Sequence, residues 1–135
     1  MKLILCVDKN GGMMFNKRRQ SQDAKVCEKI IQICEGQKLW MDEYSLKQFV
    51  DIGSQISVDN DFMSKADNDD FCFVESFVPS LEHCECLYIF NWNRKYPADL
   101  IFDVDLKKNG FKEINKEEFA GSSHDKITLK CYIRE

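Results

Sequence analysis

Two arginines and an aspartate stand close together before a predicted helix. Arg18 and Arg19 precede Asp23, and the spacing of apolar residues predicts a helix over residues 22–35. Guanidinium groups and the positive end of a helix dipole both attract anions, so this group could bind a phosphate or a carboxylate. A solvated basic loop is an equally good interpretation of the arginines. Asp23 could act as an acid or general base, or it could only stabilise the first helical turn.

His124 has hydroxyl neighbours in the segment Ser122-Ser123-His124-Asp125-Lys126. A serine and a histidine could perform acyl transfer together, but sequence neighbours seldom face each other as nucleophile and base. The chain also lacks a G-x-S-x-G motif. We therefore expect a structural loop histidine. The chain has 2 histidines, far apart, which excludes a nuclease with a cluster of metal-binding histidines.

The cysteines indicate a reducing compartment. The chain has 7 cysteines, an odd number, and no secretory segment precedes them, which favours free thiols in a cytoplasm. The tightest group is His83-Cys84-Glu85-Cys86, with only Cys72 nearby. A zinc site would need about two more ligands at suitable spacing. We expect buried thiols beside a strand and predict no metal site.

The composition indicates a single acidic domain over residues 1–135. Hydrophobic residues make up 44% and charged residues 31%, which excludes long disorder and membrane residence. The hydrophobic stretch before Asp8 is only five residues long, which is too short for a signal h-region or a membrane span. The net charge of −4 disfavours a general nucleic-acid partner. The expected location is the cytoplasm, and the composition leaves the oligomeric state open.

Apolar runs and their spacing predict strands alternating with helices. Helical spacing of apolar residues and Gly36 at the end define the helix over residues 22–35. Further helices are expected at residues 43–50 and 62–66, and strands at residues 2–7, 37–41, 55–58, 71–74, 86–90, 111–119 and 127–134. This order predicts an α/β domain with a largely parallel sheet, an antiparallel C-terminal edge, and covering helices.

Several segments, in this order, resemble the dihydrofolate reductase family. Val7-Asp8-Lys9-Asn10-Gly11-Gly12 resembles the family's V-D-x-N-x-x-I-G, and Met41-Asp42-Glu43-Tyr44-Ser45-Leu46 lines up with its M-G-R-x-T-F. Leu87-Tyr88-Ile89 with Ala98-Asp99-Leu100-Ile101-Phe102 resembles L-Y-x-T…G-D-T-x-F, and Ser123-His124 through Arg134 resembles the closing loop and last strand. The resemblance implies a three-layer dihydrofolate-reductase-like fold, mainly parallel with an antiparallel C-terminal edge.

The same resemblance assigns roles to individual residues. Asp23 takes the position of the family's acidic residue in the substrate pocket, so it is the expected catalytic residue. Asp99 and Ser123, with His124 beside it, match two loops that brace the family's active-site loop by hydrogen bonds. Arg18 and Arg19 lie in the polar run Lys17–Asp23, where the family's Leu-Pro-Trp is absent.

The departures from the family fall where it binds its cofactor. Asp42 and Glu43 replace the Gly-Arg that serves the cofactor phosphate, which turns a phosphate clamp into a repulsive site. Glu75-Ser76 replaces the Gly-Gly pair that approaches the pyrophosphate. Phe90 replaces the Thr that bonds the catalytic carboxylate. NADPH is therefore disfavoured by Asp42, Glu43 and Glu75, and no other cofactor is predicted.

Three hypotheses about function follow. The first is a diverged protein that binds a small anionic ligand, nucleotide- or pterin-like, in the family's cleft, with Asp23 as the proton-handling group. Its expected ligand-binding residues are Arg18, Arg19, Gln20, Tyr44 and Ser45. The second is a non-catalytic partner-binding or regulatory module. The third is an active NADPH-dependent reductase with atypical cofactor contacts.

Overall fold

The strand β1 (Lys2–Val7) lies at the centre of the computed structural model, which describes residues 1–49 and 56–135. The other strands are β2 (Gly12–Phe15), β3 (Arg18–Arg19), β4 (Leu39–Met41), β5 (Ile56–Val58), β6 (Phe71–Phe73), β7 (Cys86–Asn91), β8 (Leu100–Ile101), β9 (Phe111–Phe119) and β10 (Ile127–Arg134). The helices are α1 (Ala24–Ile33), α2 (Glu43–Leu46) and α3 (Phe62–Lys65).

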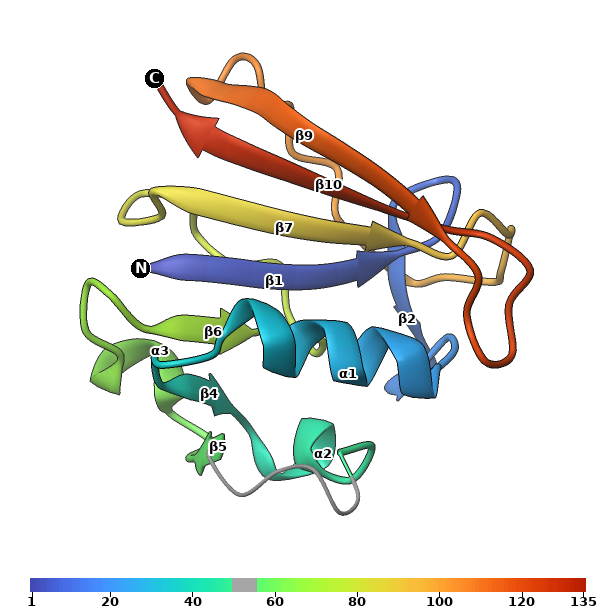
Figure 1. Ribbon diagram of the computed structural model, residues 1–135, viewed down its shortest axis with the longest axis horizontal. Coiled ribbons are helices and arrows are strands. Elements are labelled where there is room, and N and C mark those ends of the chain that lie inside the picture. The colour runs from blue at the N-terminus through green and yellow to red at the C-terminus, as the bar shows by residue number, and fades with distance from the viewer. Residues whose placement is uncertain (50–55) are drawn as a thin grey trace.

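Seven strands form the main sheet in the order β5-β4-β6-β1-β7-β10-β9. The strands from β5 to β7 pair in parallel, whereas β10 pairs antiparallel with both β7 and β9. Figure 1 shows α1 in front of this sheet and the β9–β10 hairpin along one edge. The prediction of a mixed α/β fold with a mainly parallel sheet and an antiparallel C-terminal edge is confirmed.

Alternation along the strands divides the core between the two faces of the sheet, because successive side chains point to opposite faces. Ile4 belongs to a cluster that packs with Val26, Cys27 and Ile30 of α1. Leu3 belongs to the cluster on the other face. That second cluster is covered by Phe62 of α3 and by irregular segments that carry Leu81, Cys84 and Phe102. The third layer therefore contains little helix, unlike the expected covering of helices.

The helix α1 is shorter than the residues 22–35 predicted for it. Asp23 is the N-cap, with an extended backbone and a side chain that accepts a hydrogen bond from the Lys25 amide. Cys34 is the C-cap, and Gly36 follows with a φ of 83°, a conformation that glycine adopts without strain. The N-cap role places the Asp23 carboxylate at the start of the helix.

A small antiparallel sheet, β3-β2-β8, was missed by the sequence prediction. Its hairpin turns at Asn16 and Lys17, whose φ angles of 52° and 60° are typical of a tight two-residue turn. This turn is Asn16-Lys17 and lacks the Asn-Gly or Asp-Gly pair that usually marks such turns, so the segment was expected to be a polar loop. The hairpin brings Arg19 to Tyr44 of α2, whose hydroxyl accepts a hydrogen bond from the Arg19 amide at 2.9 Å.

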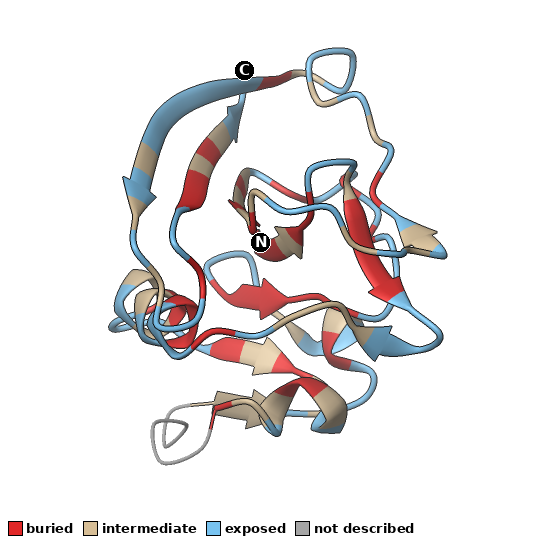
Figure 2. Cartoon of the chain, turned by 90° about the vertical axis from the view of Figure 1, so that its right-hand side faces the viewer, coloured by how far each residue is buried: buried red, intermediate tan, exposed pale blue. Residues whose placement is uncertain are grey.

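The remaining predicted elements occur with shifted ends. The helix expected over residues 43–50 ends at Leu46, and residue 50 lies outside the described residues. The strand expected at 55–58 is β5, with Gln55 also outside them. The edge strand β9 is exposed along most of its length (Figure 2). In the described ranges, 1–49 and 56–135, every helix is too short or too polar to span a membrane.

Candidate functional site

A largely buried ion pair joins Arg19 of the hairpin to Glu75, a position matched to the family's cofactor site. Arg19 Nε lies 3.1 Å from Glu75 Oε2, and the side chains are only 16% and 6% exposed. The Arg19 guanidinium stacks 4.2 Å from the centre of the Tyr44 ring and donates to the Tyr44 carbonyl at 3.0 Å. Burial opposes the charge of Arg19, but the hydrogen bonds and charge of Glu75 outweigh it and raise the pKa of the guanidinium.

Glu75 has further partners that hold it in place. Ser45 Oγ donates to Glu75 Oε1 at 2.8 Å, and Gln48 Nε2 donates to the same oxygen at 3.0 Å. Ser45 is fully buried. Tyr44 and Ser45, two of the expected ligand-binding residues, therefore contact this ion pair. Sequence reasoning recognised Glu75 as an obstacle to the cofactor and missed that Arg19 would neutralise it.

Asp8, at the end of β1, organises the turn before the hairpin. Its Oδ1 accepts hydrogen bonds from the amides of Asn10 and Gly12, and its Oδ2 accepts one from Gln20 Nε2 at 2.9 Å. Burial raises the pKa of Asp8, but these bonds and one from the Tyr96 amide outweigh it, so the pKa is lowered. The carboxylate therefore stays ionised and fixes the side chain of Gln20.

Asp23 forms the centre of a second cluster. Its Oδ1 accepts from the amides of Lys25 and Ser122, both at 2.9 Å. Its Oδ2 accepts from the Ser123 amide and from His124 Nδ1, also at 2.9 Å. Burial favours the protonated form, but the hydrogen bonds from Ser123, Ser122 and His124 outweigh it and hold the pKa of Asp23 well below its usual range. The catalytic role expected for Asp23 remains a prediction.

His124 is held by groups from three segments of the chain. Its ring stacks on Trp92 with centroids 4.7 Å apart and an angle of 25° between the planes. Its Nε2 lies 2.8 Å from Ser21 Oγ and 3.4 Å from the Tyr96 hydroxyl. Sequence reasoning considered the adjacent serines as partners. Ser123 Oγ does lie 3.2 Å from Nδ1, but the serine hydroxyl at Nε2 belongs to Ser21. No local pattern could have revealed this contact, because 103 positions separate the two residues.

Asp99 and Ser123, which were also expected to brace a loop, contact the segment that runs from the hairpin to the start of α1. Asp99 Oδ2 accepts a hydrogen bond from the Asn16 amide at 3.0 Å, and Ser123 Oγ donates to the Gln22 carbonyl at 3.2 Å. Both contacts join segments more than eighty positions apart along the chain. They connect the hairpin and the start of α1 to the C-terminal half of the domain.

A cavity of ≈ 260 Å³ lies beside the hairpin and brings several predicted residues together. It is lined by Phe15, Asn16, Arg18, Arg19, Gln20, Tyr96 and Pro97. Among residues 1–49 and 56–135, Gln20 Oε1 is a buried side-chain oxygen without a hydrogen-bond partner. Asp23 lines a separate cavity of ≈ 260 Å³ with Gln48, Ser122 and Ser123. Asp23 and the predicted ligand-binding residues thus divide between two cavities and the ion pair.

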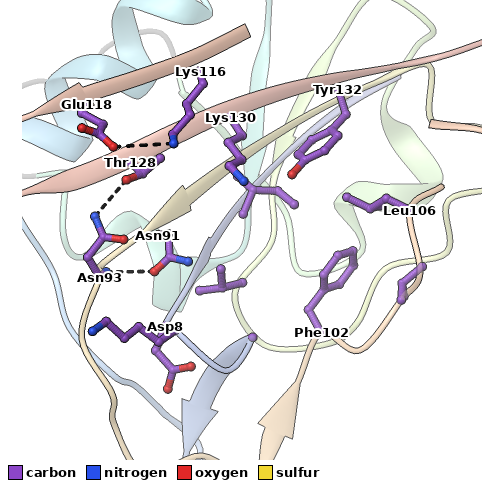
Figure 3. A pocket seen from close by; sticks show the side chains of 15 residues that line it. Asp8, Asn91, Asn93, Phe102, Leu106, Lys116, Glu118, Thr128, Lys130 and Tyr132 are labelled. Carbon is purple, nitrogen blue, oxygen red and sulfur yellow. Dashed lines mark hydrogen bonds and ion pairs between the residues drawn. The ribbon is translucent and has the colours of Figure 1, made fainter. Parts of the chain in front are cut away.

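A larger cavity, of ≈ 420 Å³, lies on the sheet face opposite α1 (Figure 3). Its polar end is formed by Asn91, Asn93 and Thr128, and its apolar end by Phe102, Leu106 and Tyr132. Asn93 Nδ2 donates to Thr128 Oγ1 at 2.9 Å. A sequence feature could have indicated this cavity. The alternation of residues 127–134 puts Thr128 and Tyr132 on the face away from Ile127.

The cysteines are free thiols, and the residues that could ligate a metal are not clustered in the described part of the chain. All seven thiols lie in that part and are free. Burial raises the pKa of Cys27, Cys34 and Cys72 to about 12 each. Within the described residues, no group of three or more His, Cys, Asp or Glu side chains is arranged to hold a metal ion.

Known proteins resemble this chain in fold rather than in sequence. Neither a protein-family model nor a curated protein matches the chain. Among solved structures, the chain is similar to a dihydrofolate reductase from Enterococcus faecalis complexed with NADP(H) and RAB-propyl, with a TM-score of 0.65 and 8% sequence identity. The match covers 99% of this chain and 95% of the other. The chain therefore has a dihydrofolate-reductase-like fold.

Proposed function

We propose that this protein binds a small anionic ligand, nucleotide- or pterin-like, beside the β2–β3 hairpin, and that it does not perform NADPH-dependent folate reduction. The observation that carries the proposal is the different use of two adjacent arginines. Arg19 forms an ion pair with Glu75. Arg18 is exposed, and it lines the cavity together with Gln20 and Tyr96. Guanidinium, amide and aromatic groups in one cavity suit an anion attached to a ring.

The Arg19–Glu75 ion pair argues against NADPH. The resemblance assigns the cofactor's phosphate groups to the positions of Asp42, Glu43 and Glu75. The carboxylates of Asp42 and Glu43 repel phosphate there, and Glu75 is already paired with Arg19. Ser76 Oγ donates to Asp42 Oδ2 at 3.2 Å, which joins the two segments that should receive the cofactor. Admitting NADPH would require separation of a buried ion pair, and leaving one partner alone costs about 3–5 kcal/mol.

The size of the cavity limits the ligand. At ≈ 260 Å³ it is slightly smaller than the cavities of roughly 300–1,000 Å³ that enclose drug-sized molecules. A single ring or a monophosphate would fit, with the remainder of the ligand outside. Phe15, with 49% of its surface exposed, could contact that outer part.

The test is a thermal-shift series with inorganic phosphate, AMP, GMP, pterin-6-carboxylate, dihydrofolate, NADP and NADPH. We expect at least one anionic ring compound to raise the melting temperature and Arg18→Ala to abolish the rise. Lys38→Ala is the matched control, because it also removes one exposed positive charge and lies beyond the opposite end of α1. NADPH oxidation in the presence of dihydrofolate should stay at the buffer rate.

Amide chemical-shift mapping locates the ligand. Shifts at residues 15–20 and 96–97 are expected, whereas shifts confined to residues 89–93 and 128–132 would move the ligand to the larger cavity and contradict the proposal. A strong NADPH-specific shift with turnover would favour the reductase hypothesis. If no compound raises the melting temperature, a non-catalytic partner-binding role becomes the better hypothesis.

A further inference from the structure

A serine, a histidine and a carboxylate form a continuous hydrogen-bonded chain where the hairpin meets α1. Ser21 Oγ lies 2.8 Å from His124 Nε2, and His124 Nδ1 lies 2.9 Å from Asp23 Oδ2. Both distances are within the range at which a base takes a proton from a nucleophile and is oriented by a third group. The side chains of His124 and Asp23 are 3% and 0% exposed, whereas Ser21 is partly exposed.

The hydrogen-bond partners determine where the protons lie. Asp23 is ionised, because amide and hydroxyl donors from Ser122 and Ser123 surround its oxygens. An ionised carboxylate only accepts, so the hydrogen on the His124 ring lies on Nδ1. The lone pair of Nε2 then faces the Ser21 hydroxyl. A general base needs this tautomer in order to take the serine proton.

The imidazole is also held in a fixed orientation. Trp92 covers one face of the ring, and the Tyr96 hydroxyl lies 3.4 Å from Nε2. Tyr96 also lines the cavity beside the hairpin. A molecule in that cavity would therefore contact a residue that touches the histidine.

We propose that Ser21 is a nucleophile for carboxylic esters, with His124 as its general base and Asp23 as a positioning residue. Ser21 Oγ bonds to the carbonyl carbon while His124 Nε2 takes the hydroxyl proton. The bond from that carbon to the alcohol oxygen then breaks, and the leaving alcohol takes the proton. A water molecule attacks the acyl-serine in the same way, which releases the carboxylic acid and restores Ser21. No electron donor or acceptor takes part.

The substrate class follows from the neighbouring cavity. Arg18 favours an ester that carries a negative charge, and this preference rests on the proposed binding function. The reactivity of Ser21 toward a neutral ester does not depend on it. The competing explanation is that the three residues only fasten the C-terminal loop to α1, in which case Ser21 would be unreactive.

The experiment is covalent labelling of the full chain with a fluorophosphonate probe, read by intact mass and by peptide mapping. We expect one adduct per chain, on Ser21, and no adduct after unfolding in guanidinium chloride. Ser21→Ala should abolish labelling while circular dichroism stays unchanged. Ser80→Ala, which removes an exposed hydroxyl elsewhere, should label at the wild-type rate. His124→Gln should slow labelling by about 100-fold or more, as expected for loss of a general base.

Two outcomes would overturn the inference: no adduct on Ser21 in the folded protein, or equal labelling before and after unfolding. A second arm compares hydrolysis of 4-nitrophenyl acetate with that of 4-nitrophenyl hemisuccinate in the wild type and in Arg18→Ala. Faster hydrolysis of the anionic ester, lost in Arg18→Ala, supports both proposals. Equal hydrolysis of the two esters in both proteins, blocked by Ser21→Ala, supports the nucleophile and contradicts the anion site.

Discussion

His124 Nδ1 lies 2.9 Å from Asp23 Oδ2 and thereby joins the C-terminal loop to the N-cap of α1 across 101 positions of the chain. The same carboxylate caps the helix and accepts hydrogen bonds from two consecutive loop amides. One ionised side chain therefore stabilises a helix end and a distant loop together. Its loss should affect both elements at once.

Acid unfolding provides a test of that carboxylate. Because hydrogen bonds lower the pKa of Asp23 in the folded state, its contribution is complete above its unfolded pKa of about 3.9 and is lost as the pH falls through the lower folded value. Asp23→Asn should therefore cost about 2 kcal/mol in urea unfolding at pH 7, and the difference from wild type should shrink below about pH 4. Asp8 also has a lowered pKa and is present in both proteins, so its contribution cancels. An equal difference at pH 3 and pH 7 would contradict the assignment.

The Arg19–Glu75 pair predicts a strong coupling. Glu75→Gln leaves Arg19 buried without its counter-charge and should destabilise the protein by about 3 kcal/mol, and adding Arg19→Met should recover part of the loss. Lys29 and Glu117 form a control pair 2.8 Å apart, but their side chains are 28% and 42% exposed. In a separate double-mutant cycle of the same design, the coupling energy of that pair should be less than about 1 kcal/mol. Similar coupling energies in the two cycles would show that burial is not decisive here.

Two glycines should respond differently to alanine. A Cβ at Gly121 would collide with the Asp23 carboxylate, so the loop would have to move and lose hydrogen bonds worth about 1.5–3 kcal/mol each. At Gly36 a Cβ would meet no atom within 4 Å, and only the φ of +83° is unfavourable, at about 1 kcal/mol. Gly121→Ala should therefore have the lower urea midpoint. The reverse order would show that the loop is not seated on Asp23.

Thiol accessibility should separate the cysteines. Five of the seven are buried, and Cys6 and Cys86 are partly exposed. Since burial also raises the pKa of Cys84 and Cys131 to about 11, these thiols stay protonated at pH 8 and react slowly. A disulfide reagent should modify at most two thiols in the native protein and all seven after unfolding. Rapid reaction of a third thiol would contradict the burial described for one of these residues.

The strands and the main helix were predictable because their cause is local. Apolar runs such as Leu3–Val7 and the alternation over residues 127–134 specify strands, and the apolar face around Val26 and Ile30 specifies α1. The small strands β2, β3 and β8 were missed, because two to four residues are too few for a periodic pattern.

The sequence by itself determined the strands of the main sheet and the helix α1, and it identified Arg18, Asp23 and His124 as residues of interest. Only the tertiary structure decided their partners. Arg19 meets Glu75 across 56 positions, and Ser21 meets His124 across 103. Such contacts depend on strand order and on where each loop returns to the sheet, which are properties of the whole chain. A local sequence pattern involves only residues that are close along the chain, so it does not specify these contacts. The partners of the site residues were therefore known only from the tertiary structure.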